Sequence, residues 1–174
     1  MVFIPFTGVD NHQKSITFAA ALMLKENTES YVWLFENFKK AMGHEPYIIM
    51  TDQDPAVIVA IQQVFQTATH RFCMWHIMFK LSDKVDSKIY NTLKFKQEIN
   101  ALVWDSDITK QQFEERWENS LEEFQLQNNE WLERMCRLRK YWILTFFNDI
   151  RIGGLIRTTS RSESQNTFFG GFLG

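Results

Sequence analysis

The stretch Ile48–Val57, with the sequence IIMTDQDPAV, decides how the middle of the chain folds. Its beginning belongs to the apolar run Tyr47–Met50, and a strand without polar positions is typical of a parallel sheet that is covered on both faces. Asp54 then stands before Pro55, and proline is favoured at the first position of a helix. Asp54 is therefore predicted to be the N-cap of the next helix, where its carboxylate accepts backbone N–H groups.

The other carboxylate of this stretch, Asp52, has no capping role in that interpretation. It stands at the carboxyl end of the predicted strand, where open α/β sheets present their ligand-binding groups. The pattern makes Asp52 a candidate functional residue. Spacing alone does not decide between a functional role and an ordinary surface acid.

The residues before this stretch predict a hairpin followed by a helix. Two apolar runs, Val2–Val9 and Ser15–Leu24, flank a polar turn and are typical of a β-hairpin. The helix that follows is predicted to have Thr28 as its N-cap and Gly43 as its stop. Its apolar stripe consists of Tyr31, Leu34, Phe35, Phe38 and Met42.

The residues after this stretch predict a helix, a short strand and then a long helical region. The strand covers Thr67–Phe72, and after Cys73 we find helical periodicity up to about Asp149 and no convincing strand. The chain is thus predicted to be an α/β sheet followed by a helical insertion or subdomain. Three apolar stripes are expected to pack into cores rather than bind ligands. They are Val57, Ile61, Val64 and Phe65; Phe113, Trp117, Leu121 and Phe124; and Trp131, Met135, Leu138 and Trp142.

Composition excludes a disordered chain and gives no direct sign of nucleic-acid binding. The 174 residues are 45% hydrophobic and 15% aromatic, enough for one domain with a core. The net charge of -2 is unevenly spread, because acids dominate 114–133 and bases dominate 134–161. Either these are solvated helix faces, or the basic half lies along a phosphate backbone.

Cysteine and histidine positions offer a weak metal-binding pattern. Cys73 and Cys136 are far apart, which predicts reduced thiols in an intracellular compartment. Cys73 and His76 form a C-x-x-H pair, but a zinc site normally needs four ligands, so packing is favoured over zinc. The apolar run near the N-terminus is too short for a membrane span.

Glu163 is a further candidate, in the stretch TTSRSESQNTFF. Ser160–Glu163 matches a capping box, in which the glutamate at the third helical position reaches back to the N-cap backbone. Taken alone, this pattern favours a structural role for Glu163.

The order of these motifs resembles a known family. TDQDPAVIVAIQQVFQTATHRFCMWHI, then FEERWENSLEEF and NEWLERMCRLRKYWI, then RTTSRSESQNTFF, is similar to the transposase domain of Mutator-like elements. It is still more similar to the far-red-impaired-response family, plant transcription regulators derived from such transposases. The opening PFTGVDNHQKSITFAAALM resembles the second and third strands of that family. The resemblance extends from Pro5 to about Phe169.

The resemblance implies a ribonuclease H-like fold: a mixed five-stranded sheet with a helical insertion. The active site of such a fold is a triad of two Asp and one Glu that holds two Mg²⁺ or Mn²⁺ ions for phosphoryl transfer. By this resemblance Asp52 matches the second Asp and Glu163 the Glu. Cys73 and His76 match the C-x-x-H signature of the family, with a site-supporting role.

The first Asp of the triad has no match in this sequence. The family places it on a strand upstream of Val2, and Asp10 falls in the hairpin turn. The sheet is therefore expected to lack its first strand, which leaves two edges with unpaired backbone groups. We expect poor metal binding, negligible strand transfer, and a chain that is a fragment of a gene model or of a decayed element. Its expected parts are a sheet region (1–80), a helical insertion (81–150) and the start of the final catalytic-type helix (151–174).

The expected function is a non-catalytic, transposase-derived domain of a nuclear DNA-binding transcription regulator, used for dimerisation or DNA contact. DNA affinity and zinc are expected in flanking domains, and partners are expected to include a second copy or other family members, with no membrane role. One alternative is a truncated transposase that performs metal-dependent DNA cleavage and strand transfer. Another is a nonfunctional remnant or a protein-interaction module.

Overall fold

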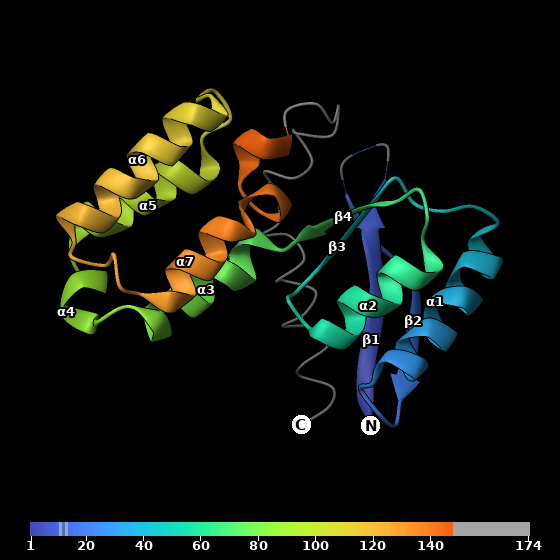
Figure 1. Cartoon of the computed structure of the whole chain (residues 1–174). Helices are drawn as coiled ribbons and strands as arrows, with labels where there is room; N and C mark the ends of the chain where they lie inside the picture. The colour runs from blue at the N-terminus through green and yellow to red at the C-terminus, as the bar shows by residue number, and fades with distance from the viewer. Residues whose placement is uncertain (11, 13, 148–174) are drawn as a thin grey trace. The chain divides into compact units, whose positions relative to one another are not determined.

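A computed structural model describes residues 1–10, 12 and 14–147, and the chain divides into two compact units after Cys73 (Figure 1). The first unit is mixed α/β, and the described part of the second is helical. Within the described residues, no helix has the length and apolar character needed to cross a membrane.

The first unit begins with the predicted hairpin of β1 (Val2–Val9) and β2 (Ser15–Met23), which pair antiparallel. The turn is held by Asp10, whose Oδ1 accepts the N–H groups of His12 and Lys14 at 2.8 Å each. Asp10 therefore has a local structural role, as the sequence indicated.

The hairpin contains one bulge. Phe6 pairs with Ala19 and Thr7 with Thr17, so Phe18 is an extra residue on β2. The Phe18 ring lies over Gly8, where an added Cβ would come within 2.3 Å of Cε2. A larger residue at Gly8 would therefore displace this ring, which is 48% exposed.

Helix α1 (Thr28–Met42) starts one residue earlier than predicted. Its N-cap is Asn27, whose Oδ1 accepts the N–H of Ser30 at 3.0 Å, so the prediction of Thr28 as the cap was wrong. Asn27 is extended and stands one residue nearer the start, and asparagine caps at least as well as threonine. Gly43 ends the helix with a left-handed φ of 75°, as predicted.

A strand–helix–strand unit follows, with β3 (Ile48–Thr51), α2 (Pro55–Val64) and β4 (Thr69–Phe72). The two strands are parallel, with Ile48 opposite Thr69. Strand β4 begins two residues later than predicted because Thr67 is engaged elsewhere. Its N–H and its hydroxyl both donate to Glu45 Oε2 at 2.7 Å.

Glu45 connects the C-terminal ends of α1 and α2 to the loop that precedes β4. Besides Thr67 it accepts a bond from Lys39 Nζ at 2.5 Å, and Lys39 also donates to the carbonyl of Val64 at 2.9 Å. These donors, Lys39 first and Thr67 next, hold the pKa of the Glu45 carboxyl well below its usual value.

The two small sheets share one core but form separate hydrogen-bonded ladders in the described part of the chain. Helices α1 and α2 pack on it, and every residue of β3 stays partly exposed. The parallel pairing of β3 is confirmed, whereas burial on both faces is not, because β3 has a strand neighbour on one side only among these residues. The core residues are Met23, Tyr31, Leu34, Phe35, Val57, Ala60, Ile61, Val64 and Phe65, with Ile4, Phe6, Ala21 and Ile49 packed against them.

The described part of the second unit is helical, as predicted. It contains α3 (Met74–Lys84), α4 (Ser87–Tyr90), α5 (Leu93–Trp104), α6 (Lys110–Glu123) and α7 (Glu130–Arg137), followed by two 3-10 turns at Arg139–Tyr141 and Leu144–Phe147. Four of the helices have side-chain caps, from Asp86, Thr92, Thr109 and Asn129.

The core of the second unit departs from two predicted stripes. Along α6 the buried face runs through Phe113, Trp117 and Ser120, and the predicted Leu121 and Phe124 are only half-buried. The stripe from Trp131 to Trp142 is not one helix, because α7 ends at Arg137. Trp142 is nevertheless buried, and its indole N–H donates to the carbonyl of Met135 at 2.9 Å.

Candidate functional site

The two carboxylates after β3 lie at the start of α2. Asp54 Oδ1 accepts the N–H groups of Ala56 at 2.8 Å and Val57 at 3.0 Å. Pro55 occupies the first helical position and has no N–H. The prediction that Asp54 caps this helix is confirmed.

Asp52 lies at the carboxyl end of β3, and its side chain is exposed. Its Oδ1 accepts the N–H of Asp54 at 3.2 Å. The four N–H positions at the start of an α-helix have no helical partner. Here two are satisfied by Asp54, one by Asp52, and one is absent at Pro55. Both carboxylates thus contribute to the helix start.

Hydrogen bonds from Thr51 of β3 and from Cys73, just after β4, fix the backbone next to Asp52. The Thr51 hydroxyl donates to the carbonyl of Asp52 at 2.8 Å, and the N–H of Cys73 donates to the carbonyl of Thr51 at 2.7 Å. His70 Nε2 lies 2.8 Å from Thr51 Oγ1. Because the Thr51 proton is already donated, His70 is the donor in this bond.

His70 is neutral at pH 7. Burial lowers its pKa to about 4, and the nearby charge of Arg71 acts in the same direction. The sequence motifs assign no role to His70. Its contact with Thr51 follows from the register of β3 and β4, which no sequence pattern indicates.

The structure tests only part of the predicted acidic site. Glu163 and its capping-box stretch lie outside the described residues, so the meeting of Asp52 and Glu163 stays a prediction. Cys73 is buried and contributes its backbone N–H at the end of β3. His76 has a buried Nδ1 without a hydrogen-bond partner. Over residues 1–10, 12 and 14–147, no three His, Cys, Asp or Glu side chains come together as metal ligands. The described residues alone therefore supply no complete set of ligands, and the predicted set of Asp52 with Glu163 is not tested by them.

The basic stretch after 133 is partly neutralised where it is described. Arg139 Nη2 lies 2.5 Å from Glu114 Oε1, and Arg137 lies 3.4 Å from Glu133. Lys140 instead stands over the ring of Tyr141 at 5.0 Å. These pairs favour solvated, mutually compensated helix faces over a continuous phosphate-binding surface in this part of the chain.

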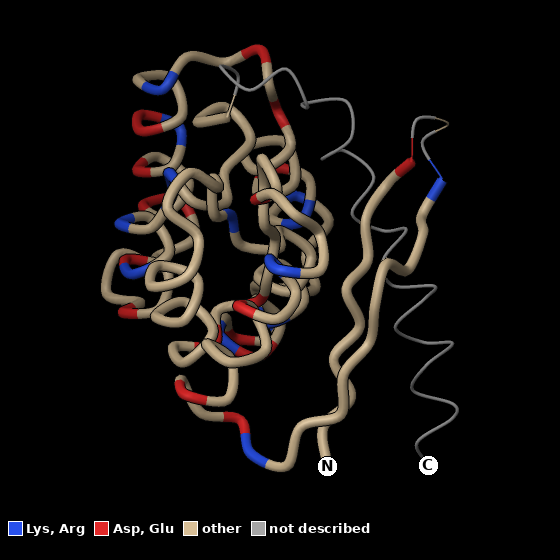
Figure 2. The backbone as a smooth tube through the Cα atoms, turned by 90° about the vertical axis from the view of Figure 1, so that its right-hand side faces the viewer, with Lys and Arg blue, Asp and Glu red and all other residues tan. Residues whose placement is uncertain are grey.

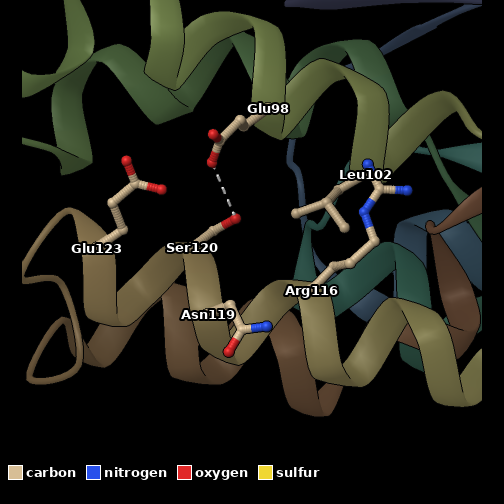
Figure 3. A pocket seen from close by; sticks show the side chains of 6 residues that line it. All are labelled: Glu98, Leu102, Arg116, Asn119, Ser120 and Glu123. Atoms are coloured by element: carbon tan, nitrogen blue, oxygen red, sulfur yellow. Dashed lines mark hydrogen bonds between the residues drawn. The ribbon is translucent and has the colours of Figure 1, made fainter.

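A small polar cavity of about 280 Å³ lies between α5 and α6 (Figure 3). Ser120 donates to Glu98 Oε2 at 3.4 Å across it, and Lys94 pairs with Glu123 at its rim. It is lined by Glu98, Leu102, Arg116, Asn119, Ser120 and Glu123. No His or Cys lines it, so it contains neither a thiol nucleophile nor an imidazole base.

Comparison with known proteins matches residues 1–80 to the MULE transposase domain. In Arabidopsis thaliana, the protein FAR1-RELATED SEQUENCE 5 is 34% identical over 98% of this chain and 22% of its own length. FAR-RED IMPAIRED RESPONSE 1 is 31% identical over 97% of this chain and 20% of its own length. FAR1-RELATED SEQUENCE 2 is 32% identical over 88% of this chain and 19% of its own length.

The first of these matches identifies residues 1–80 as similar to a transposase domain of the MULE class. Over nearly its whole length the chain is similar to proteins of the far-red-impaired-response family. The chain spans about a fifth of the length of these relatives. The predicted resemblance is thereby confirmed at the level of the family.

Proposed function

We propose that this chain is a scaffold domain of a nuclear, DNA-binding transcription regulator and that its 174 residues do not catalyse strand transfer. The similarity to these relatives supports the regulatory role, because the family that the sequence resembles consists of plant transcription regulators. The observation that carries the non-catalytic part is the environment of Asp52. It is an exposed acid whose side chain bonds the helix start, so its position is accounted for without a metal ion.

The arrangement of strands supports a ribonuclease H-like ancestry for this scaffold. An antiparallel pair and a parallel pair contribute to one core without a shared ladder in the described residues. A five-stranded mixed sheet from which one inner strand is missing would have this pattern. The end of β3, held by Thr51 and His70, is where such a sheet would carry its second acid.

Metal titration tests the non-catalytic proposal directly. Isothermal titration of the 174-residue chain with Mn²⁺ is expected to show no saturable binding, and D52N is expected to behave in the same way. Binding with micromolar affinity that D52N abolishes would overturn the proposal and favour the truncated transposase. A second titration uses a chain extended upstream by its native residues. If that longer chain binds Mn²⁺ and D52N has no effect, the ancestral metal role of Asp52 is wrong.

DNA contact is proposed to come from flanking domains, which would also carry any zinc. The net charge of -2 and the compensated Arg139 and Arg137 support weak intrinsic affinity. Fluorescence anisotropy with duplex DNA is expected to show no binding tighter than the roughly 100 µM of weak non-specific contacts. Tight, salt-dependent binding by the chain alone would place the DNA surface on this domain instead.

Thermal unfolding distinguishes a folded scaffold domain, which should unfold cooperatively, from a nonfunctional remnant, which should not. The core of the first unit includes well-packed aromatic pairs, such as Phe6 stacked on Phe38 with ring centres 4.2 Å apart. Such packing supports a cooperative transition. A broad transition without an unfolding enthalpy peak would favour the remnant.

A further inference from the structure

The polar cavity between α5 and α6 contains one carboxylate, that of Glu98, which has no ion-pair partner in the described part of the chain. The other acids around it are paired: Glu123 with Lys94, and Asp105 Oδ2 with Arg116 Nη1 at 3.5 Å. Three carboxylates therefore stand against two cations, and the cavity keeps one negative charge in excess. Elsewhere along the helices acidic and basic residues are interspersed (Figure 2).

Ser120, opposite Glu98, is a buried hydroxyl with a long hydrogen bond. It continues the buried face of α6 after Phe113 and Trp117, and it is only 7% exposed. Its Oγ lies 3.4 Å from Glu98 Oε2, whereas O–H···O bonds are usually about 2.5–3.0 Å long. Because buried polar groups in proteins are normally well bonded, this contact leaves the hydroxyl with unused acceptor capacity.

One ammonium group can bond both oxygens. Its N–H···O bonds to a carboxylate are about 2.7–2.9 Å long, and a nitrogen can lie at that distance from both Glu98 Oε2 and Ser120 Oγ, which are 3.4 Å apart. An ammonium group has three donors, and it neutralises the charge of Glu98. A water molecule could bond the same two oxygens, but it would leave that charge uncompensated.

The remainder of the cavity suits a short alkyl chain. Leu102 supplies an apolar wall, and Figure 3 shows it beside Arg116, at the end of the cavity away from Glu123. The Arg116 guanidinium at this end would repel a second cation. The volume of about 280 Å³ is close to the lower limit of ligand pockets, about 300 Å³. The ligand is therefore expected to be small and to carry one positive charge.

We propose that this cavity binds a primary alkylammonium group, as carried by a lysine side chain or by a small free amine. The ammonium group bonds Glu98 and Ser120, and its methylene groups lie along Leu102. The site lies wholly in the helical unit and goes beyond the proposed scaffold role. Because Glu98 is only half-buried, water screens the ion pair, and we expect a Kd on the order of 1 mM for the ammonium group alone.

The test is an NMR titration of the 174-residue chain with butylammonium chloride at constant ionic strength, from about 0.1 to about 20 mM, a range that brackets this value. The backbone amide signals of Glu98 and Ser120 are expected to shift and to saturate. Tetramethylammonium chloride is the control, because it has the same charge and no N–H group to donate. A titration with butylammonium that does not saturate, or equal shifts with tetramethylammonium, would overturn the proposal.

Substitutions test which groups hold the ammonium ion. E98Q keeps an oxygen at the site but removes the charge, so it should weaken binding at least about tenfold. S120A removes one neutral acceptor and should weaken binding roughly threefold. E115Q is the matched control, because it removes the same charge from an exposed position on α6, where Glu115 accepts a bond from Gln111 Nε2 at 2.9 Å. It should leave binding unchanged.

Thermal unfolding of each variant confirms that the chain is folded. Unchanged binding by E98Q or S120A, or a loss in E115Q as large as that in E98Q, would contradict the assigned site. A second ligand, Nα-acetyl-lysine N-methylamide, distinguishes the two sources of the ammonium group. If it binds at least as tightly as butylammonium, the cavity accepts a lysine side chain of another protein. If butylammonium alone binds, the ligand is a small free amine.

Discussion

Substitution of the two aspartates before α2 should have unequal effects on stability. D54A leaves the N–H groups of Ala56 and Val57 without their bonds of 2.8 and 3.0 Å. Loss of an N-cap costs about 1 kcal/mol, with a range of roughly 0.5–2. D52A removes one longer bond to a solvent-exposed N–H, which water can replace, so we expect only a few tenths of a kcal/mol.

Differential scanning calorimetry measures this difference. For a unit of this size a loss of about 1 kcal/mol lowers Tm by roughly 4–8 °C. We therefore expect that shift for D54A and a shift of about 1–2 °C for D52A. D54N is the control, because asparagine caps about as well as aspartate, and it should stay close to the unsubstituted protein. Equal losses from D54A and D52A, or a larger loss from D52A, would refute the assignment of cap and exposed acid.

Three further predictions concern the first unit. Since the folded pKa of Glu45 is lowered, its stabilisation is present above its ordinary value of 4.5 and declines as pH falls below it, so E45Q should flatten the dependence of Tm on pH there. His70 should titrate by NMR with a pKa of about 4, and a value near 6.5 would show that it is not buried against Thr51. F35A should cost about 3–5 kcal/mol in urea unfolding because Phe35 is buried in the core, whereas W33A, at a position that is 62% exposed, should cost less than about 1.

Local signals in the sequence were enough to predict much of this fold. Asp54 with Pro55 marked the start of α2, and Gly43 marked the end of α1, because each residue acts on its own turn. The choice between Asn27 and Thr28 was harder, because both can cap and adjacent positions differ only in backbone conformation. The predicted start of α1 was therefore wrong by one residue, because two residues that can cap a helix are adjacent there.

Contacts between distant segments could not be predicted in this way. Thr67 was expected in β4, but the carboxylate of Glu45, 22 residues earlier, holds it in the preceding loop. The bond between His70 and Thr51 depends on strand register, and the buried position of Ser120 depends on its bond to Glu98. Each of these requires knowledge of what lies opposite in space, which periodicity along one segment does not contain.

The bond from the Asp54 N–H to Asp52 has a consequence for how ancestry is judged in this family. An acid at this position assists the beginning of a helix whether or not any ion ever binds. This benefit to the helix is small, but it is independent of cleavage chemistry. The presence of an aspartate at this place is therefore not by itself a marker of enzymatic competence, which has to be judged from ion binding or turnover.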